Sequence, residues 1–459
     1  MSAWPKGIPM TQPMPIARAQ SGNSPFAHLR EMRTNLIAYL EHLARQGDLL
    51  RINLGLASAY FINHPDAVRE VLVTQAHKCQ KPFGVKQAAR ALFGENLFTS
   101  DGEVWRVLRA AQQPAFHAQR VNAYAAIMAD HTAQLLAAWQ PGQTIDIPQQ
   151  MMDLTLGITT KALFNVDLRG HEAGQAIIRF IELFNQRIAS PIPIPGWLPT
   201  PRNREMKRLI GVADAMLQPI IEERRAAGED KGDVLSMILL AQKADQSGIL
   251  TDHQVRNEIN NLFAAGYEVT GNTLAFTLYL LSQHPVVEAQ LVAELDQVLG
   301  ERPVTVDDLA NLSYLEMVIK ESMRLLPVTT VVARQTVDTL RLGDYVIPKN
   351  QTVLVAPWTL HRHPAYFAQP EQFEPERFHA DRREAIHKQA YIPFVTGPRI
   401  CLGNAFAMLQ LKVNLATILQ RYRLTVAPGY TFAPIFRFNT RPKDGLPMVV
   451  QPRLKALFS

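Results

Sequence analysis

The sequence contains very little cysteine: two residues, Cys79 and Cys401, in a chain of 459. Two cysteines exclude a disulfide framework, and they also exclude a cysteine-rich zinc site. No apolar run is long enough to cross a bilayer, and residues 1–24 are polar and proline-rich, without the apolar core of a signal peptide. We therefore expect a cytoplasmic protein without a transmembrane segment.

Basic residues outnumber acidic residues only slightly, by 47 to 41. A net charge of +6 is small for this length, which argues against a nucleic-acid-binding protein. It is compatible with a basic surface that docks an acidic partner, and equally with an ordinary solvated surface. The hydrophobic content of 47% is ample for a large core.

Most of the chain shows helical periodicity, whereas apolar and polar residues alternate near both ends, at 49–62 and 423–450. The expected fold class is therefore mainly α with a smaller β lobe. Helices are expected around 25–47, 101–113, 119–139, 148–164, 172–186, 204–227, 251–282, 315–326 and 404–419. A proline-rich stretch at 190–201 could separate two domains.

The segment around Cys401 has the order F-x-x-G-x-R-x-C-x-G, formed by Phe394, Gly397, Arg399, Cys401 and Gly403. Gly397 permits a turn that other residues resist, and Arg399 stands two residues before the sulfur. Cys401 directly precedes helix 404–419, whose N-terminal amides and dipole favour an anion. A lone cysteine is more often a buried apolar residue. The surrounding pattern instead predicts a thiolate that binds a metal.

Two further patterns place complementary side chains on one helix face. Glu321 and Arg324 are three residues apart and can pair, and Arg377, in a later P-E-R-F segment, can share the carboxylate. Trp105 and Arg109 are four residues apart, so an indole N–H and a guanidinium point the same way. Either pattern alone is common on solvated helices.

Together these motifs resemble the cytochrome P450 family, in which the cysteine of this loop is the axial ligand of haem iron. The resemblance covers nearly the whole chain, and it implies haem b as cofactor with Cys401 as the iron ligand. The cofactor-binding residues would be Trp105, Arg109, Arg334, Phe394, Arg399, Cys401 and Gly403. Four of these, Trp105, Arg109, Arg334 and Arg399, would contact the propionates. Glu321, Arg324 and Arg377 would form the structural triad of the family.

The family fold is a triangular helical bundle around a buried haem. The resemblance thus implies an N-terminal tail at 1–24 and a single domain at 25–459. A small β-rich lobe would come from the N-terminal and C-terminal strands, and a large α lobe from 65–330 and 364–421. Because the motifs lie on both sides of 190–201, we interpret that stretch as a loop at the pocket edge and not as a domain boundary.

The oxygen-activating helix departs from the family pattern at one position. The corresponding residues are Ala265, Gly266, Glu268, Val269 and Thr270. Val269 occupies the place of the usual threonine, and Thr270 follows one residue later. Since Thr270 is turned by about 100° from Val269 on a helix, only a local register change at Gly266 would let its hydroxyl replace the missing one.

The resemblance implies a monooxygenase that inserts one atom of O2 into a hydrophobic small molecule. Its electrons would come from a ferredoxin- or flavodoxin-type donor with its reductase. Val269 leaves three outcomes open: hydroxylation assisted by the substrate, oxygenation that leaks peroxide, or a peroxide-driven or non-oxygenating reaction. A haem sensor without turnover is a further alternative, although no sensory or DNA-binding module accompanies the motifs.

Residues carried over from the family, apolar except for two threonines, predict the substrate pocket and favour a lipid or terpenoid-like substrate. They are Phe83, Phe98, Phe180, Phe184, Val328, Thr329, Thr330 and Phe436. We expect a basic face at Arg106, Lys388, Arg399 and Lys412 to meet the electron donor. We also expect a monomer.

Overall fold

The computed structural model describes residues 15–21, 26–54, 57–169, 171–188, 198–436 and 439–453, and for residues 88, 91–93, 173, 177, 181 and 184–188 only the backbone. The chain forms two compact units. The first comprises residues 1–87, 320–401 and 434–441, and the second comprises 88–319, 402–433 and 442–459. The first unit thus includes 364–401, which the sequence analysis placed in the α lobe. That the two units form one domain stays a prediction.

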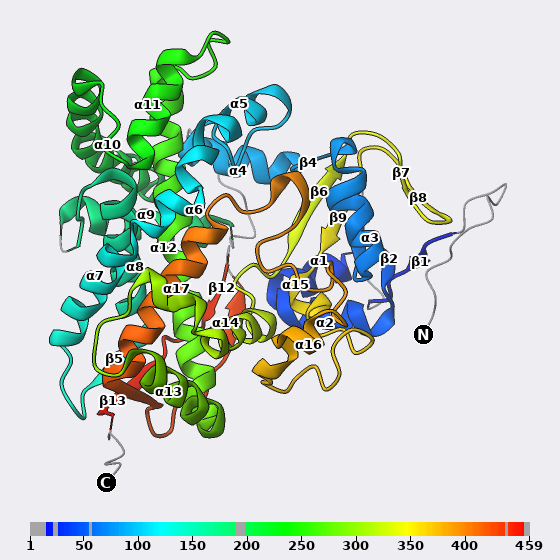
Figure 1. The fold of residues 1–459 in the computed structure, drawn as a ribbon. Coiled ribbons are helices and arrows are strands. Elements are labelled where there is room, and N and C mark those ends of the chain that lie inside the picture. The colour runs from blue at the N-terminus through cyan, green and yellow to red at the C-terminus, as the bar shows by residue number, and fades with distance from the viewer. Residues whose placement is uncertain are drawn as a thin grey trace. The chain divides into compact units, whose positions relative to one another are not determined.

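A six-stranded sheet organises the first unit, in the order β1-β2-β3-β9-β6-β4 (Figure 1). Its strands are β1 (Ala17–Arg18), β2 (Leu49–Asn53), β3 (Ser58–Ile62), β4 (Cys79–Gln80), β6 (Val332–Thr336) and β9 (Thr352–Val355). Two small pairs are β7 (Leu340–Leu342) with β8 (Tyr345–Ile347), and β11 (Pro434–Phe436) with β12 (Thr440–Pro442). The strand pair expected at 49–62 is confirmed as the antiparallel pair of β2 and β3.

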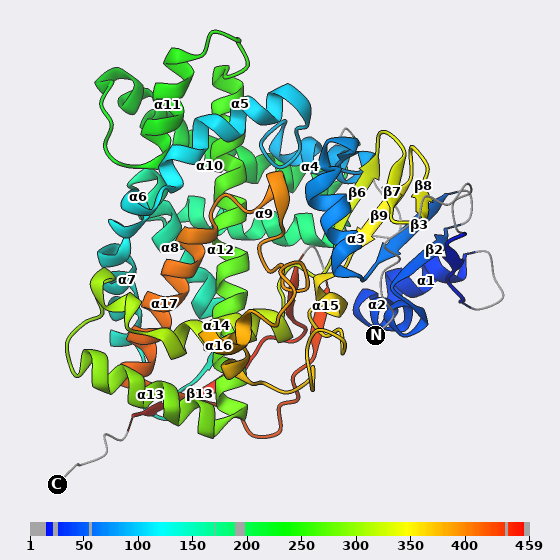
Figure 2. The same ribbon diagram turned by 45° about the vertical axis from the view of Figure 1, so that its right-hand side comes forward.

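The helices of this unit cover both faces of the sheet (Figure 2). They are α1 (Ala27–Thr34), α2 (Leu36–Gln46), α3 (Pro65–Arg69), α15 (Pro357–Leu360) and α16 (Ala380–Arg383), with the π-helix η1 (Glu70–Thr74) and the 3-10 turns η2 (Ala76–Lys78), η5 (Pro375–Phe378) and η6 (Gly397–Arg399). Successive residues of β3 point to opposite faces. Phe61 packs in the core with Leu40 of α2, whereas Ile62 packs with Val68 of α3. The sheet is thereby buried on both sides.

The second unit is mainly helical. Its helices are α5 (Gly102–Gln112), α6 (Ala118–Asn122), α7 (Ala125–Ala137), α8 (Ile147–Phe164), α9 (Glu172–Ile188), α10 (Pro201–Ala227), α11 (Val234–Ala244), α12 (Asp252–Gln283), α13 (Pro285–Leu299) and α17 (Asn404–Arg421), with the 3-10 turns η3 (Gln113–Phe116) and η4 (Val306–Ala310). A three-stranded sheet, β10-β13-β5, is formed by β10 (Tyr422–Val426), β13 (Pro447–Pro452) and β5 (Thr144–Asp146). The unit boundary falls inside α4 (Phe83–Phe93) and α14 (Ser313–Leu325).

Helix α12 is the longest element of the second unit and packs against α8 and α17 (Figure 1). It starts where the Thr251 side chain accepts a hydrogen bond from the Gln254 N–H over 3.2 Å, as expected for an N-cap. Two glycines let α8 approach closely, since a Cβ at Gly266 would overlap the Thr159 methyl group and one at Gly271 would crowd Met152. None of the helices in the described part of the chain has an apolar stretch long enough to cross a membrane.

Candidate functional site

Cys401 closes a tight loop in the first unit. Its backbone N–H donates to the Phe394 carbonyl oxygen over 3.0 Å. Within this loop the Ile400 N–H donates to the Gly397 carbonyl oxygen, also over 3.0 Å, which completes the turn η6. Cys401 itself is exposed. The loop therefore presents the cysteine at its surface and does not bury it in the core.

The backbone of this loop is fixed by its packing on η1. Gly397 has a φ of 76°, and a Cβ at this position would overlap the carbonyl oxygen of Leu72. Val395 has a φ of 64°, which is strained for a β-branched residue, and its side chain packs on the core that contains Leu72. The glycine predicted from the sequence is thus required both by its conformation and by a close contact.

Helix α17 begins three residues after Cys401. Gly403 is its N-cap, and the Ala407 N–H donates to the Gly403 carbonyl oxygen over 2.8 Å. Amides of a helix N-terminus favour a nearby anion, which supports a thiolate at Cys401. A Cβ at Gly403 would meet only Phe116, at 3.8 Å, among the described residues. The packing of the second unit would thus tolerate a side chain at this position.

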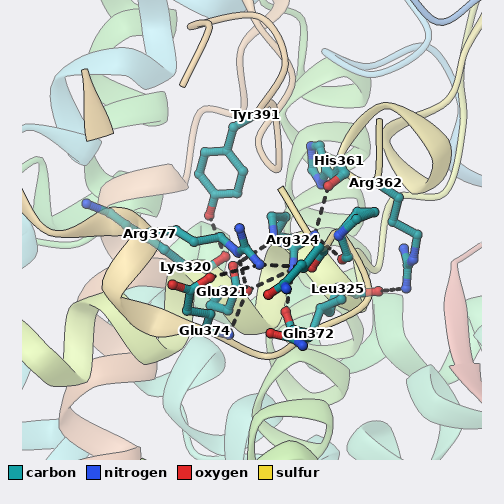
Figure 3. Close-up of polar contacts among 12 residues, drawn as sticks. Lys320, Glu321, Arg324, Leu325, His361, Arg362, Gln372, Glu374, Arg377 and Tyr391 are labelled. Carbon is teal, nitrogen blue, oxygen red and sulfur yellow. Dashed lines mark hydrogen bonds and ion pairs between the residues drawn. The ribbon is translucent and has the colours of Figure 1, made fainter. Parts of the chain in front are cut away.

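Glu321, Arg324 and Arg377 form the buried cluster that the sequence predicts (Figure 3). Arg324 donates to Glu321 through Nε (2.7 Å) and Nη2 (2.8 Å), and Arg377 Nε donates to Glu321 Oε1 over 3.2 Å. Glu321 and Arg324 are fully buried, and Arg377 is nearly so. The backbone N–H of Glu374 donates to Glu321 Oε1 as well, over 2.9 Å. The carboxylate therefore accepts four hydrogen bonds from three residues.

Arg324 also ties down the chain between α15 and η5. Its Nη1 donates to the carbonyl oxygens of His361 (3.0 Å) and Pro370 (2.6 Å), and its Nη2 donates to that of Gln372 (2.9 Å). One side chain thus satisfies three carbonyl groups outside the regular elements. This arrangement fixes residues 361–377, which precede the Cys401 loop in the first unit.

His361 is a buried member of the same region that sequence reasoning missed. Its Nε2 accepts a hydrogen bond from the Ile392 N–H over 2.9 Å. Burial, and to a lesser degree Arg324 and Arg362, lower the pKa of His361 to about 3, so the ring is neutral at physiological pH. It links α15 to the segment that leads into the Cys401 loop. The only signal in the sequence is the L-H-R-H-P run, which does not indicate burial.

The predicted propionate-binding residues lie on three elements. Arg399 is half-buried at the end of η6 in the first unit. Trp105 and Arg109 are half-buried on α5 in the second unit, whereas the intervening Arg106 is exposed. Arg334 is 9% exposed on β6 in the first unit, and its charge opposes the effect of burial, which raises the pKa of Cys79 to about 11. A thiol with that pKa stays protonated, in agreement with a structural role for Cys79.

Helix α12 is continuous from residue 252 to 283, with no π-turn or break at Gly266. Ala265 is exposed and Val269 is half-buried, whereas Thr270 is 5% exposed and lies on the buried side. The register change that would bring the Thr270 hydroxyl to the position of Val269 is therefore absent from this helix. Glu268 is buried as well, at 4% exposure.

Cys401 is suited to bind a metal ion that is already held by the other ligands of a cofactor. In the described ranges, no three side chains of His, Cys, Asp or Glu gather in a way that could hold a metal ion. A metal bound by this cysteine would therefore take its remaining ligands from a cofactor. Taken separately, the thiolate candidate and Arg334 in the first unit and Arg109 in the second are groups of the kinds that an anionic metal macrocycle such as haem requires.

Comparison with known proteins decides the family. The family model described as cytochrome P450 matches residues 20–453. The chain belongs to the cytochrome P450 family. It is 34% identical to a cyclooctat-9-en-7-ol 5-monooxygenase of Streptomyces melanosporofaciens over 97% of both chains, and 29% identical to a pentalenene oxygenase of Streptomyces avermitilis over 93% of this chain and 95% of the relative.

A solved structure confirms the fold. The crystal structure of the cytochrome P450DA heme domain matches with a TM-score of 0.87 and 27% identity, over 96% of this chain and 99% of that one. This P450 is therefore a mainly α protein with smaller sheets, as the sequence predicts, and it is a haem-iron oxidoreductase of the monooxygenase class.

The pocket residues predicted for the P450 are distributed over both units. Val328, Thr329 and Thr330 lie in the first unit, where the Thr440 N–H donates to the Val328 carbonyl oxygen over 2.8 Å. The hydroxyl of Thr330 is buried and bonded to that of Thr440. Thr330 therefore secures β12, and of these three residues Thr329 is the more accessible.

The phenylalanines predicted for the pocket differ in exposure. Phe83 is 63% exposed and Phe436 on β11 is half-buried in the first unit. In the second unit, Phe98 is half-buried in the loop before α5, and Phe180 is buried on α9. The side chain of Phe184 lies outside the described residues. Most of the loop predicted at 190–201 also lies outside them.

Proposed function

We propose that this P450 inserts one oxygen atom of O2 into a terpenoid-like small molecule. The observation that carries the substrate class is the 34% identity, over nearly the whole of both chains, to a relative named as a monooxygenase of cyclooctat-9-en-7-ol. The relative named pentalenene oxygenase supports the same class. The apolar character of the predicted pocket residues agrees with such a ligand.

Haem b is the proposed cofactor, with Cys401 as the axial ligand of the iron. Bound haem would supply the iron that activates O2, and an anionic sulfur ligand favours cleavage of the O–O bond. Trp105, Arg109, Arg334 and Arg399 would donate hydrogen bonds to its propionates. The sequence contains no C-x-x-C-H motif for covalent attachment, which supports non-covalent haem b.

Proton delivery is where this chain differs from the family pattern. A valine at 269 offers no hydroxyl, and the continuous helix keeps Thr270 on the buried side. Glu268 would therefore hold the proton, with a polar group of the substrate or an ordered water completing the relay. The same observation favours the second candidate function, a peroxide-driven or non-oxygenating haem-thiolate enzyme.

The electrons would come from a ferredoxin- or flavodoxin-type protein and its reductase. Support comes from the exposed basic residues Arg106 and Lys388. Lys412, which the sequence analysis assigned to the same basic face, instead forms an ion pair with Glu316 and is 14% exposed. Its charge is therefore compensated within the second unit.

Two measurements test this proposal. The ferrous carbon monoxide complex should show the strongly red-shifted absorption of thiolate ligation, and Cys401→Ser should abolish it. Turnover of pentalenene and of cyclooctat-9-en-7-ol should then be compared with NAD(P)H plus a surrogate ferredoxin and reductase, and with hydrogen peroxide alone. Product formed only with the redox proteins supports the monooxygenase, and product formed only with peroxide supports the second candidate. A purified protein that binds no haem would overturn both.

A further inference from the structure

Glu258, on α12, is a buried carboxyl group that the proposed chemistry does not use. It is fully buried and accepts three hydrogen bonds. The Leu97 N–H and Gln254 Nε2 donate to its Oε1 over 2.8 and 2.9 Å, and Gln112 Nε2 donates to its Oε2 over 2.8 Å. The three donors come from the loop before α5, from α12 and from the end of α5. All of these residues belong to the second unit.

Neighbouring residues of α12 hold the same loop, residues 94–100. Gln254 Nε2 and Asn257 Nδ2 both donate to the carbonyl oxygen of Glu95, over 2.8 and 3.0 Å. A Cβ at Gly94 would overlap the Asn257 amide, so the loop backbone lies directly against α12. With Glu258, three side chains on one face of α12, within little more than one turn, thus fix one short segment to the helix.

The loop is also rigid within itself. Asn96 Oδ1 accepts hydrogen bonds from the N–H groups of Phe98 (2.9 Å) and Thr99 (3.1 Å), and Thr99 Oγ1 accepts one from the Asn96 N–H (2.9 Å). Phe98 directly follows Leu97, whose N–H is held by Glu258. A displacement of the Leu97 amide would therefore carry the Phe98 side chain with it.

Burying a carboxyl group to fix a loop costs free energy, because the group loses its hydration. Burial raises the pKa of Glu258 to about 7, although its three hydrogen bonds work in the opposite direction, and no charged side chain contributes. Well-packed apolar residues often stabilise an interior as well as buried charges do. A carboxyl group on which three donors converge therefore points to a requirement for position in addition to stability.

We propose that Glu258 is a positioning residue that sets the shape selectivity of the substrate pocket by holding the loop 94–100, and with it Phe98, against α12. This inference rests on the proposed oxygenase function only in assigning Phe98 to the pocket. The holding contacts themselves are those given above. The bulk of the substrate would then be limited by a pocket wall whose position α12 fixes.

Two azole ligands of haem iron test this selectivity without knowledge of the substrate. Imidazole is small, whereas 4-phenylimidazole carries an apolar ring that would touch the pocket wall. In the ferric holoenzyme, Glu258→Ala should weaken 4-phenylimidazole about tenfold, a typical effect of losing one aromatic contact, and should leave imidazole within about twofold. Glu258→Gln should restore native behaviour, because its carbonyl can accept from Leu97 and its amide can pair with Gln112 Oε1, which has no hydrogen-bond partner among the described residues.

A double-mutant cycle and a matched control separate positioning from loss of stability. Phe98→Ala should reproduce the selective loss, and adding Glu258→Ala to it should cause no further change. Glu288→Ala removes another buried carboxyl group of the second unit. Glu288 lies on α13 and accepts a hydrogen bond from Arg423 over 2.9 Å. This substitution should lower stability without changing the ratio of the two affinities. Glu258→Asp, a milder change, serves if the alanine variant does not fold.

Hydrogen exchange gives a readout that needs no haem. The Leu97 amide should exchange about tenfold faster or more in Glu258→Ala, and at the native rate in Glu258→Gln. Unchanged exchange, equal effects on both azoles, or additive effects with Phe98→Ala would each overturn the proposal. If the native protein bound no haem, the proposed function would fall while the exchange experiment still decided whether Glu258 holds the loop.

Discussion

Val269 is the residue whose chemistry separates this chain from the family pattern. Its side chain cannot donate a proton, and Thr270 lies on the buried side of a helix that shows no break. Val269→Thr should place a hydroxyl one turn after Ala265 and one residue after Glu268. We expect the fraction of electrons recovered as product to rise severalfold. This is less than the roughly hundredfold change in rate that one positioned proton donor can produce.

The measurement is product formed per NAD(P)H consumed, together with hydrogen peroxide released. Thr270→Val is the matched control, because it removes the buried hydroxyl and should leave the coupling unchanged. If Val269→Thr left coupling as it was, valine at this position would not be a handicap. A loss of coupling in Thr270→Val would show that its hydroxyl takes part after all.

Glu258 should make the protein less stable as the pH rises from about 4.5 to about 7. Burial raises the pKa of this carboxyl to about 7 in the folded protein, above the ordinary value of 4.5 expected when unfolded. Between these values the folded state binds more protons, so the free energy of unfolding falls with pH by up to about 1.4 kcal/mol per unit. Below about pH 4.5 the carboxyl group is protonated in both states, so the protein keeps the full stability that it loses at higher pH.

Urea unfolding at several pH values, for the native protein and Glu258→Gln, isolates this effect. The variant cannot ionise at 258, so the difference between the two curves should slope across this window. His361 contributes equally to both proteins, and its lowered pKa acts in the opposite direction, with stability lost as the pH falls below about 6.5. A flat difference curve would mean that Glu258 titrates normally.

At the scale of elements, the segment that leads to Cys401 depends on Arg324. Arg324→Ala would leave the buried carboxylate of Glu321 with a weaker set of partners and would remove the donors to the carbonyl oxygens of His361, Pro370 and Gln372. Breaking a buried pair in this way costs about 3–5 kcal/mol. We therefore expect an unfolding free energy lower by that amount, and a reduced haem content.

Urea unfolding and the ratio of haem to protein absorbance measure the two effects. Arg382→Ala is the matched control, since Arg382 pairs with Glu374 in the same region but is half exposed. It should cost less than about 1 kcal/mol. Equal losses in the two variants would contradict a special role for the buried cluster.

Local spacing predicted the pair of Glu321 and Arg324, and the resemblance to the family added Arg377; other long-range contacts are not visible in the sequence. Glu321 and Arg324 lie three apart on one helix, so their spacing alone places them together. The helix expected at 119–139 is instead divided into α6 and α7, because Tyr124 turns inward and donates to the Gly232 carbonyl oxygen over 2.8 Å. Glu258 escaped prediction for the same reason, since its donors Leu97 and Gln112 lie about 150 residues away in sequence.

Gly266 has a packing requirement in addition to the role predicted for it. The family pattern assigns it to oxygen activation, and the structure adds a packing requirement, because α8 approaches so closely that a Cβ would overlap Thr159. The Thr155 and Thr159 hydroxyls of α8 also donate to carbonyl oxygens of α12, at Tyr267 (2.8 Å) and Gly266 (3.3 Å). These contacts anchor α12 in one register and explain why no widened turn forms there.

At the scale of the whole molecule, the net charge of +6 bears on how electrons arrive. An acidic ferredoxin or flavodoxin would be attracted at low salt, and screening beyond about 10 Å at 0.1 M salt would weaken that encounter. The rate of haem reduction by a surrogate ferredoxin should therefore fall severalfold between about 20 and 300 mM NaCl. Reduction by dithionite, which needs no docking, should change much less.

Charge reversal locates the contact. Arg106→Glu and Lys388→Glu alter exposed side chains and should each slow protein-mediated reduction severalfold, since rim charges act mainly on association rates. Lys243→Glu makes the same change on α11 at a residue outside the proposed docking set, and it should have no more than the general effect of net charge. If all three variants slowed reduction equally, the attraction would come from the total charge alone. If none of the variants slowed reduction, the donor would be recognised through contacts other than these basic residues. The rate of reduction should then also be independent of salt.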